Sequence, residues 1–179
     1  MDVASIRELV YNKIQNPVWY RIRFLIDLRQ VYGMRKDVII RINGCPKYDD
    51  ADGEVIELTT AGRLYRKNGS YYIMYKESEL TGMAGVTTTL KVEEKRVTMM
   101  RNGLHPTQMV FEKGQRHFGV YNTEFGSLTV AVSARDVRQS MTDSGGDLFI
   151  DYAIEVDNVL TGENLFQIHV KEAGGEIKS

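Results

Sequence analysis

The stretch DLFIDYAIEVD, residues 147–157, alternates between apolar side chains and side chains that are mostly acidic or small. Every second residue is apolar or aromatic: Leu148, Ile150, Tyr152, Ile154 and Val156. Successive side chains of a β-strand point to opposite faces of the sheet, so a period of two predicts a strand with one buried face. We expect Ile150 and Ile154 to face a core, and Asp151 and Glu155 to face water.

The same period of two continues over most of the chain after residue 36, in short runs separated by turn residues. The candidate strands are 37–43, 54–67, 70–77, 86–92, 96–101, 107–112, 115–122, 127–135, 147–157 and 164–171. Asn68-Gly69 and Asn102-Gly103 are strong signals for two-residue hairpin turns, and Thr161-Gly162-Glu163 precedes the last strand.

This pattern is typical of a β-meander, because the connections are too short for parallel crossovers. We therefore predict an all-β fold: a single antiparallel up-and-down β-barrel of about eight strands, in which some candidates merge or lie at an edge. The interior of such a barrel is either filled by side chains or holds one small ligand, and the sequence leaves this open.

Residues 1–33 differ from the rest of the chain, because their apolar residues recur at helical spacing. We expect two short helices, 5–15 and 18–31, which form an N-terminal extension. The predicted organisation is this extension at 1–33, a barrel domain at 34–172 and a flexible tail at 173–179. Met34 offers a second start, so the extension is either an appendage from an upstream start or an arm that docks on a partner, on lipid or on the barrel.

The composition of the chain excludes some classes of binding partner. The 179 residues carry a net charge of −1, so no basic excess recruits nucleic acid. No stretch approaches the 18 apolar residues of a membrane span. Cys45 is the single cysteine, which excludes an intramolecular disulfide and fits a reducing compartment. We predict a cytoplasmic protein without nucleic-acid partners, and we leave a homodimer open.

The motifs of common catalytic and metal sites are missing. His105, His117 and His169 lie on separate segments, and no local spacing brings them to one metal ion. No Gly-x-Ser-x-Gly elbow or phosphate-cradling glycine loop occurs. The acidic residues 147, 151, 155 and 157 share one parity of one strand, which is typical of a solvated outer face. We expect no cofactor, no metal and no catalytic residue of a known motif.

Two candidate strands carry an apolar row that ends in a charged residue. The rows are Tyr71, Ile73, Tyr75 and Glu77 on one strand, and Val97, Met99 and Arg101 on the other. A charge in line with a core row must be paired or lie where the core meets water. We therefore predict that Tyr75, Glu77 and Arg101 lie together at one mouth of the barrel.

These three residues are the candidate ligand-binding site. A tyrosine offers an amphipathic wall, and an arginine offers a fork suited to a carboxylate or phosphate. Two alternatives stay open: Glu77 and Arg101 form a purely structural pair, or the opposite parity of the strand, with Tyr72 inward, is correct.

Several stretches resemble one bacterial family. They are YYIMYKESELTGMAGVTTTLKV at 71–92, YNTEFG at 121–126, GGDL at 145–148 and GENLFQI at 162–168. Together they resemble the YwiB-type proteins from about Met34 to Glu172. The resemblance implies a calycin-like, lipocalin-resembling barrel in cytoplasmic bacterial proteins. That family is a domain of unknown function, so the resemblance carries over no catalytic or binding residue.

The leading functional hypothesis is non-enzymatic binding of a small amphipathic or anionic ligand. The alternative is a protein–protein interaction module that docks through the N-terminal helices or a sheet edge. The third hypothesis is an enzyme with an active site that follows no sequence motif.

Overall fold

The computed structural model describes residues 35–48, 51–52, 56–123 and 126–174. The helices expected at 5–15 and 18–31 lie outside these ranges, as does most of the expected tail, so these expectations and the boundary at residue 34 remain predictions. The described chain is a β-sheet with one 3-10 turn, η1 (Glu79–Thr81).

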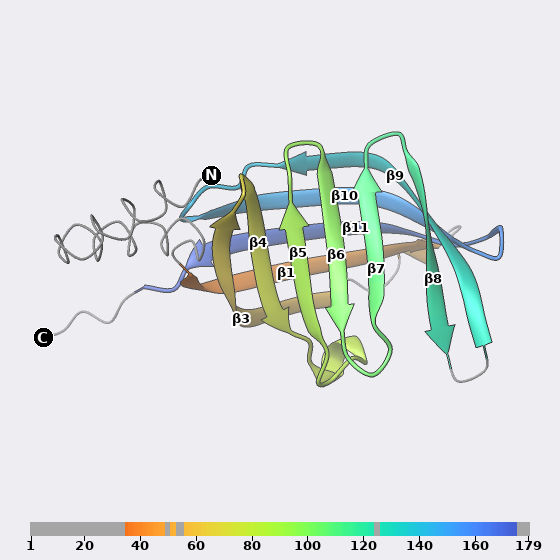
Figure 1. The fold of residues 1–179 in the computed structure, drawn as a ribbon, viewed down its shortest axis with the longest axis horizontal. Coiled ribbons are helices and arrows are strands. Elements are labelled where there is room, and N and C mark those ends of the chain that lie inside the picture. The colour runs from red at the N-terminus through yellow and green to blue at the C-terminus, as the bar shows by residue number, and fades with distance from the viewer. Residues whose placement is uncertain (1–34, 49–50, 53–55, 124–125, 175–179) are drawn as a thin grey trace, which may run out of the picture. The chain divides into compact units, whose positions relative to one another are not determined.

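Each strand hydrogen-bonds antiparallel to its neighbours (Figure 1). The strands are β1 (Lys36–Tyr48), β2 (Ala51–Asp52), β3 (Ile56–Lys67), β4 (Ser70–Lys76), β5 (Thr87–Val92), β6 (Arg96–Asn102), β7 (Thr107–Glu112), β8 (Arg116–Thr123), β9 (Gly126–Gln139), β10 (Gly145–Val156) and β11 (Val159–Glu172). Their order is β7-β6-β5-β4-β3-β1-β11-β10-β9-β8, with short β2 paired to β1. The prediction of an all-β, antiparallel, up-and-down fold is confirmed.

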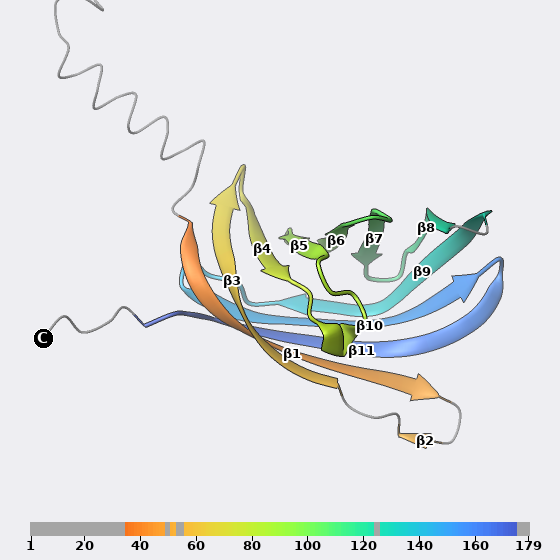
Figure 2. The ribbon, with the colours of Figure 1, turned by 90° about the horizontal axis from the view of Figure 1, so that it is seen from below.

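β1 pairs with β3 on one side and with β11 on the other, which joins the first and last strands of the chain in one sheet, and this sheet curls into a nearly closed barrel (Figure 2). The wall formed by β4–β7 consequently lies across from β9–β11 (Figure 2). Within the described chain, the ladder is interrupted between β7 and β8, which pair with β6 and β9 respectively. The predicted number of about eight strands is wrong: ten strands form the path, because each candidate is bounded by its own turn and none of them merges.

The turns show where local signals are reliable. Asn68 and Gly69 have φ angles of 50° and 81°, so the expected two-residue turn forms. Asn102-Gly103 does not make such a turn, because Asn102 ends β6 and a loop over 103–106 leads to β7. β10 turns into β11 at Asp157 and Asn158, with φ angles of 48° and 67°, so β11 begins earlier than predicted.

The predicted faces of the strand at 147–157 are confirmed at Ile150 and Asp151, but Ile154 does not belong to the core. Ile150 is fully buried in the core, whereas Ile154 is only partly buried. Asp151 pairs with Arg135 at 2.7 Å on the outer face. Glu155 likewise forms an ion pair on that face. These two acidic residues therefore form ion pairs on the outer face of the barrel.

Gly62 in β3 has no room for a side chain, because a core residue and the neighbouring strand β4 both lie close to it. A Cβ atom at this residue would lie 2.3 Å from Ile40 Cδ1 and 2.6 Å from the carbonyl oxygen of Met74. We expect Gly62→Ala to lower the free energy of unfolding by about 1–3 kcal/mol, because a backbone carbonyl cannot move away cheaply. Urea denaturation measures this loss. Gly44→Ala in β1 is the control, since nothing lies within 4 Å of its added Cβ; equal losses for both variants would contradict the packing.

Candidate functional site

The structure brings Tyr75, Glu77 and Arg101 together inside one end of the barrel. Tyr75 is near the end of β4, Glu77 follows that strand directly, and Arg101 is near the end of β6. The Arg101 Nε atom lies 3.7 Å from Glu77 Oε1. Ile73 and Tyr75 are both buried in the core, which excludes the alternative parity with Tyr72 inward.

The end of the apolar row predicted that Glu77 lies at a solvent-exposed mouth of the barrel. Instead, Glu77 is buried. Its side chain is only 2% exposed, whereas that of Arg101 is 22% exposed. The Glu77 N–H donates to the carbonyl oxygen of Val86 at 2.9 Å, so the backbone pairing continues past the end of β4 and encloses the carboxylate. The Thr88 hydroxyl donates to Glu77 Oε1 at 2.5 Å and supplies a partner for the buried charge.

Two tyrosines complete the surroundings of this ion pair. Burial raises the pKa of the Tyr75 hydroxyl far above its ordinary value; the charge of Glu77 raises it further, and the charge of Arg101 opposes both. Burial also raises the pKa of Tyr152 in β10, again opposed by Arg101. Both hydroxyls therefore stay protonated at neutral pH, and that of Tyr75 interacts with the side chains of Glu77 and Thr88. The Tyr152 ring packs edge-on against Phe111 of β7, with 4.8 Å between centroids.

Arg101 has hydrogen-bonding capacity that its surroundings do not use. Its Nε atom is buried and makes no hydrogen bond within the described part of the chain, because the contact with Glu77 is too long for one. A buried donor without a partner costs free energy unless a ligand or water satisfies it. The Nε atom of Arg101 is therefore a buried donor that no hydrogen bond within the described residues satisfies.

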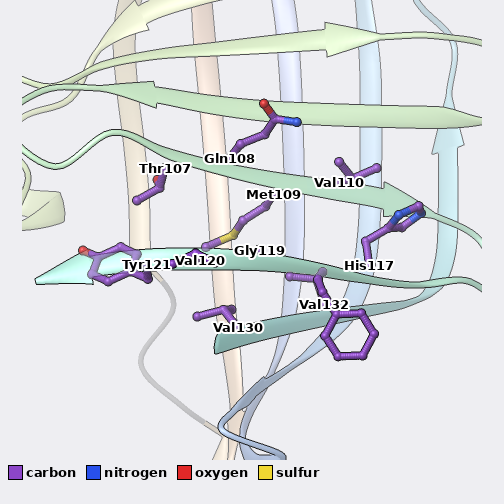
Figure 3. Close-up of a pocket in the computed structure, with 11 residues that line it drawn as sticks. Thr107, Gln108, Met109, Val110, His117, Gly119, Val120, Tyr121, Val130 and Val132 are labelled. Carbon is purple, nitrogen blue, oxygen red and sulfur yellow. The ribbon is translucent and has the colours of Figure 1, made fainter. Parts of the chain in front are cut away.

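A cavity of about 180 Å³ lies where the ladder is interrupted, between β7, β8 and β9. Its lining residues are Thr107, Gln108, Met109, Val110, His117, Phe118, Gly119, Val120, Tyr121, Val130 and Val132. Thr107 and Tyr121 lie at one end of the cavity, His117 and Val110 lie at the other, and Met109 lies between them (Figure 3). The cavity is therefore apolar in its middle and polar at both ends.

None of Tyr75, Glu77 and Arg101 lines this cavity, but the β6–β7 ladder connects the two places. Thr107, at one end of the cavity, is the residue directly opposite Arg101 in the β6–β7 ladder. No motif in the sequence predicted this cavity. One signal was present: a glycine inside a strand often marks a close backbone approach, and a Cβ atom at Gly119 would lie 3.3 Å from the carbonyl oxygen of Gln108 across the gap.

The remaining candidates have ordinary surroundings. His105 is exposed, and His169 contacts Asp147 at 2.7 Å on the surface. No group of three His, Cys, Asp or Glu side chains suited to a metal ion occurs in the described ranges. Nor do those ranges contain a helix with the length and apolar character needed to cross a lipid bilayer. Cys45 is half-buried.

Comparison with known proteins gives one consistent relationship. Residues 40–168 match the family described as "Domain of unknown function (DUF1934)". The chain is 30% identical over 127 residues to the "Uncharacterized beta-barrel protein YwiB" of Bacillus subtilis (strain 168), which covers 71% of this chain and 87% of that protein. The crystal structure of the ywiB protein from Bacillus subtilis superimposes with a TM-score of 0.67 at 24% identity, over 78% of this chain and 94% of that one.

Proposed function

The chain belongs to the DUF1934 family, as its resemblance to YwiB-type proteins predicted, and from this premise we propose that it binds a small amphipathic anion inside its barrel. The observation that carries the proposal is Arg101, a partly buried arginine whose Nε atom has no hydrogen-bond partner among the described residues and which lies opposite Thr107 of the cavity wall in the β6–β7 ladder. Arg101 receives the anionic group, and the apolar part of the ligand extends along Met109, Val130 and Val132. Glu77 holds the guanidinium in place.

In this role the barrel would enclose a small ligand, as the barrels of calycins and lipocalins do. We propose that it acts in the cytoplasm. Such a protein performs no chemistry on its ligand, so the roles of Tyr75, Glu77 and Arg101 are binding and positioning.

A docking module is the second candidate, favoured by exposed apolar side chains on β8. Phe118 and Val120 are 61% and 63% exposed, and β8 pairs with only one neighbour among the described strands. The edge of β8 is not freely open to an added strand, however, because the carbonyl of Gln108 approaches it at Gly119. Ligand binding is therefore the better supported function.

Calorimetric titration with decanoate and with its neutral analogue decanol tests the proposal. We expect decanoate to bind the full chain, and Arg101→Lys to weaken its binding about tenfold, because lysine keeps the charge but loses the guanidinium fork. Binding of decanol should be the same in both proteins.

Arg138→Lys is the matched control, since this exposed arginine packs over Phe149 and pairs with Asp136 on the outer face. It should leave the binding of both ligands unchanged. Failure of decanoate to bind, or equal affinities for the Arg101→Lys variant and the unmodified chain, would refute the proposed function.

A further inference from the structure

The cavity between β7, β8 and β9 passes through the wall of the barrel. Its lining includes Phe118 and Val120, which are 61% and 63% exposed on the outer face of β8. It also includes Val132 of β9, which is 3% exposed and belongs to the core. A space bordered by residues of both kinds reaches from the outer face to the inside of the barrel. The cavity is therefore a slot in the wall, and we call it the β7–β8 slot.

The slot lies where the wall lacks a hydrogen-bonded ladder. Among the described strands, β7 pairs only with β6 and β8 pairs only with β9. A movement of β7 away from β8 consequently breaks no ladder hydrogen bond, whereas it would break several between any two paired strands. Local opening has its lowest free energy where few hydrogen bonds and buried contacts are lost. The β7–β8 slot is thus the part of the wall that widens most easily.

Backbone hydrogen bonds fix only one end of the slot. At the turn that joins β7 to β8, the Gly114 N–H donates to the carbonyl oxygen of Ala134 in β9 at 2.9 Å, and the Ala134 N–H donates to the carbonyl oxygen of Gln115 at 3.4 Å. Thr107 and Tyr121 lie at the other end (Figure 3), where no hydrogen bond joins the two strands within the described ranges. The slot can therefore widen at its Thr107 end while the turn stays in place.

The end of the barrel beside Arg101 offers no comparable route. The side chain of Glu77, which pairs with Arg101, is only 2% exposed. The Glu77 N–H donates to the carbonyl oxygen of Val86 at 2.9 Å, so the backbone closes over this place. A ligand that came from this end would have to break that hydrogen bond and displace the buried carboxylate. The free end of the slot, by contrast, lies at Thr107, directly opposite Arg101 in the β6–β7 ladder.

We infer that the ligand enters and leaves the barrel sideways, through the β7–β8 slot. This inference rests on the proposed function and adds the route by which the amphipathic anion reaches its site. Phe118 and Val120 border the outer opening of this route, where their exposed apolar side chains contact the hydrocarbon part of the passing ligand.

The exchange kinetics of decanoate on the full chain test the inference. NMR line shapes of isotopically labelled decanoate give the dissociation rate, calorimetry gives the dissociation constant, and their ratio gives the association rate. We expect Val120→Trp to slow association and dissociation alike, about three- to tenfold, because a larger side chain in a passage raises the same barrier in both directions. Phe118→Ala removes bulk from the same opening and should accelerate both rates.

Val159→Trp is the matched control for Val120→Trp. Val159 is 67% exposed at the start of β11 and does not line the slot. The same substitution at this residue therefore adds the same side chain to the surface without narrowing the passage. It should leave both rates unchanged.

The outcomes separate the two proposals. If decanoate does not bind the unmodified chain, the proposed function fails and this inference fails with it. If decanoate binds, but Val120→Trp and Phe118→Ala exchange it as fast as the unmodified chain does, the inference alone is overturned. A change confined to the dissociation rate would likewise overturn it, since such a change reports a contact with the bound ligand and not a barrier along its path.

Discussion

Replacement of Phe111 by alanine is expected to lower the free energy of unfolding by about 3–5 kcal/mol. Phe111 is fully buried in the core and packs edge-on against Tyr152 from the opposite wall. It belongs to β7, which hydrogen-bonds to a single neighbour among the described strands, β6. Its ring therefore fixes the otherwise free side of β7 to the rest of the barrel. Urea denaturation followed by circular dichroism measures the loss.

Phe118→Ala is the matched control for this prediction. It removes the same side chain from β8, where Phe118 is 61% exposed and rests under the guanidinium of Arg116. We expect a change within about 0.5 kcal/mol, as for most surface substitutions. Losses of similar size for the two variants would mean that β7 and β8 are packed differently from the structure.

The second large effect concerns the buried ion pair. Arg101→Met removes the positive partner of Glu77, whose carboxylate is 2% exposed and keeps the Thr88 hydroxyl as a hydrogen-bond donor. We expect the free energy of unfolding to fall by about 2–4 kcal/mol, because the removal of one partner leaves the other charge buried and uncompensated. Thermal or chemical denaturation at neutral pH measures this loss.

Arg96→Met controls for the loss of an arginine–carboxylate pair as such. Arg96 binds Glu112 at 2.7 Å, but both side chains reach solvent, so Glu112 is rehydrated when its partner is removed. The loss for Arg96→Met should be clearly smaller than for Arg101→Met. Equal losses for the two variants would contradict the expectation that the buried carboxylate of Glu77 destabilises the fold once its partner is removed.

Local patterns in the sequence predicted the strands well, because side-chain alternation reports directly which face is buried. The alternation at 147–157 correctly placed Ile150 in the core and Asp151 outside. The turn at Asp157 and Asn158 was missed because it contains no glycine, although asparagine and aspartate tolerate a positive φ. The number of strands was underestimated because neither alternation nor turn signals determine how many candidates one sheet includes.

The candidate site was predicted only in part. The two apolar rows ending in Glu77 and Arg101 predicted that these residues meet, and Arg101 Nε lies 3.7 Å from Glu77 Oε1. The burial of Glu77 was not predictable, since it depends on a backbone hydrogen bond to Val86 beyond the strand end. The cavity depends on the interruption between β7 and β8, a property of sheet closure that no short motif encodes.

The central claim is that an amphipathic anion occupies the cavity with its charged group at Arg101. A crystal structure of the full chain with 10-bromodecanoate tests it most directly, because anomalous scattering locates the bromine and the density locates the carboxylate. The account predicts the carboxylate within about 3 Å of the Arg101 guanidinium and the bromine inside the cavity, beyond Met109 and toward His117. A bromine bound outside the cavity, with no carboxylate density at Arg101, would contradict the account.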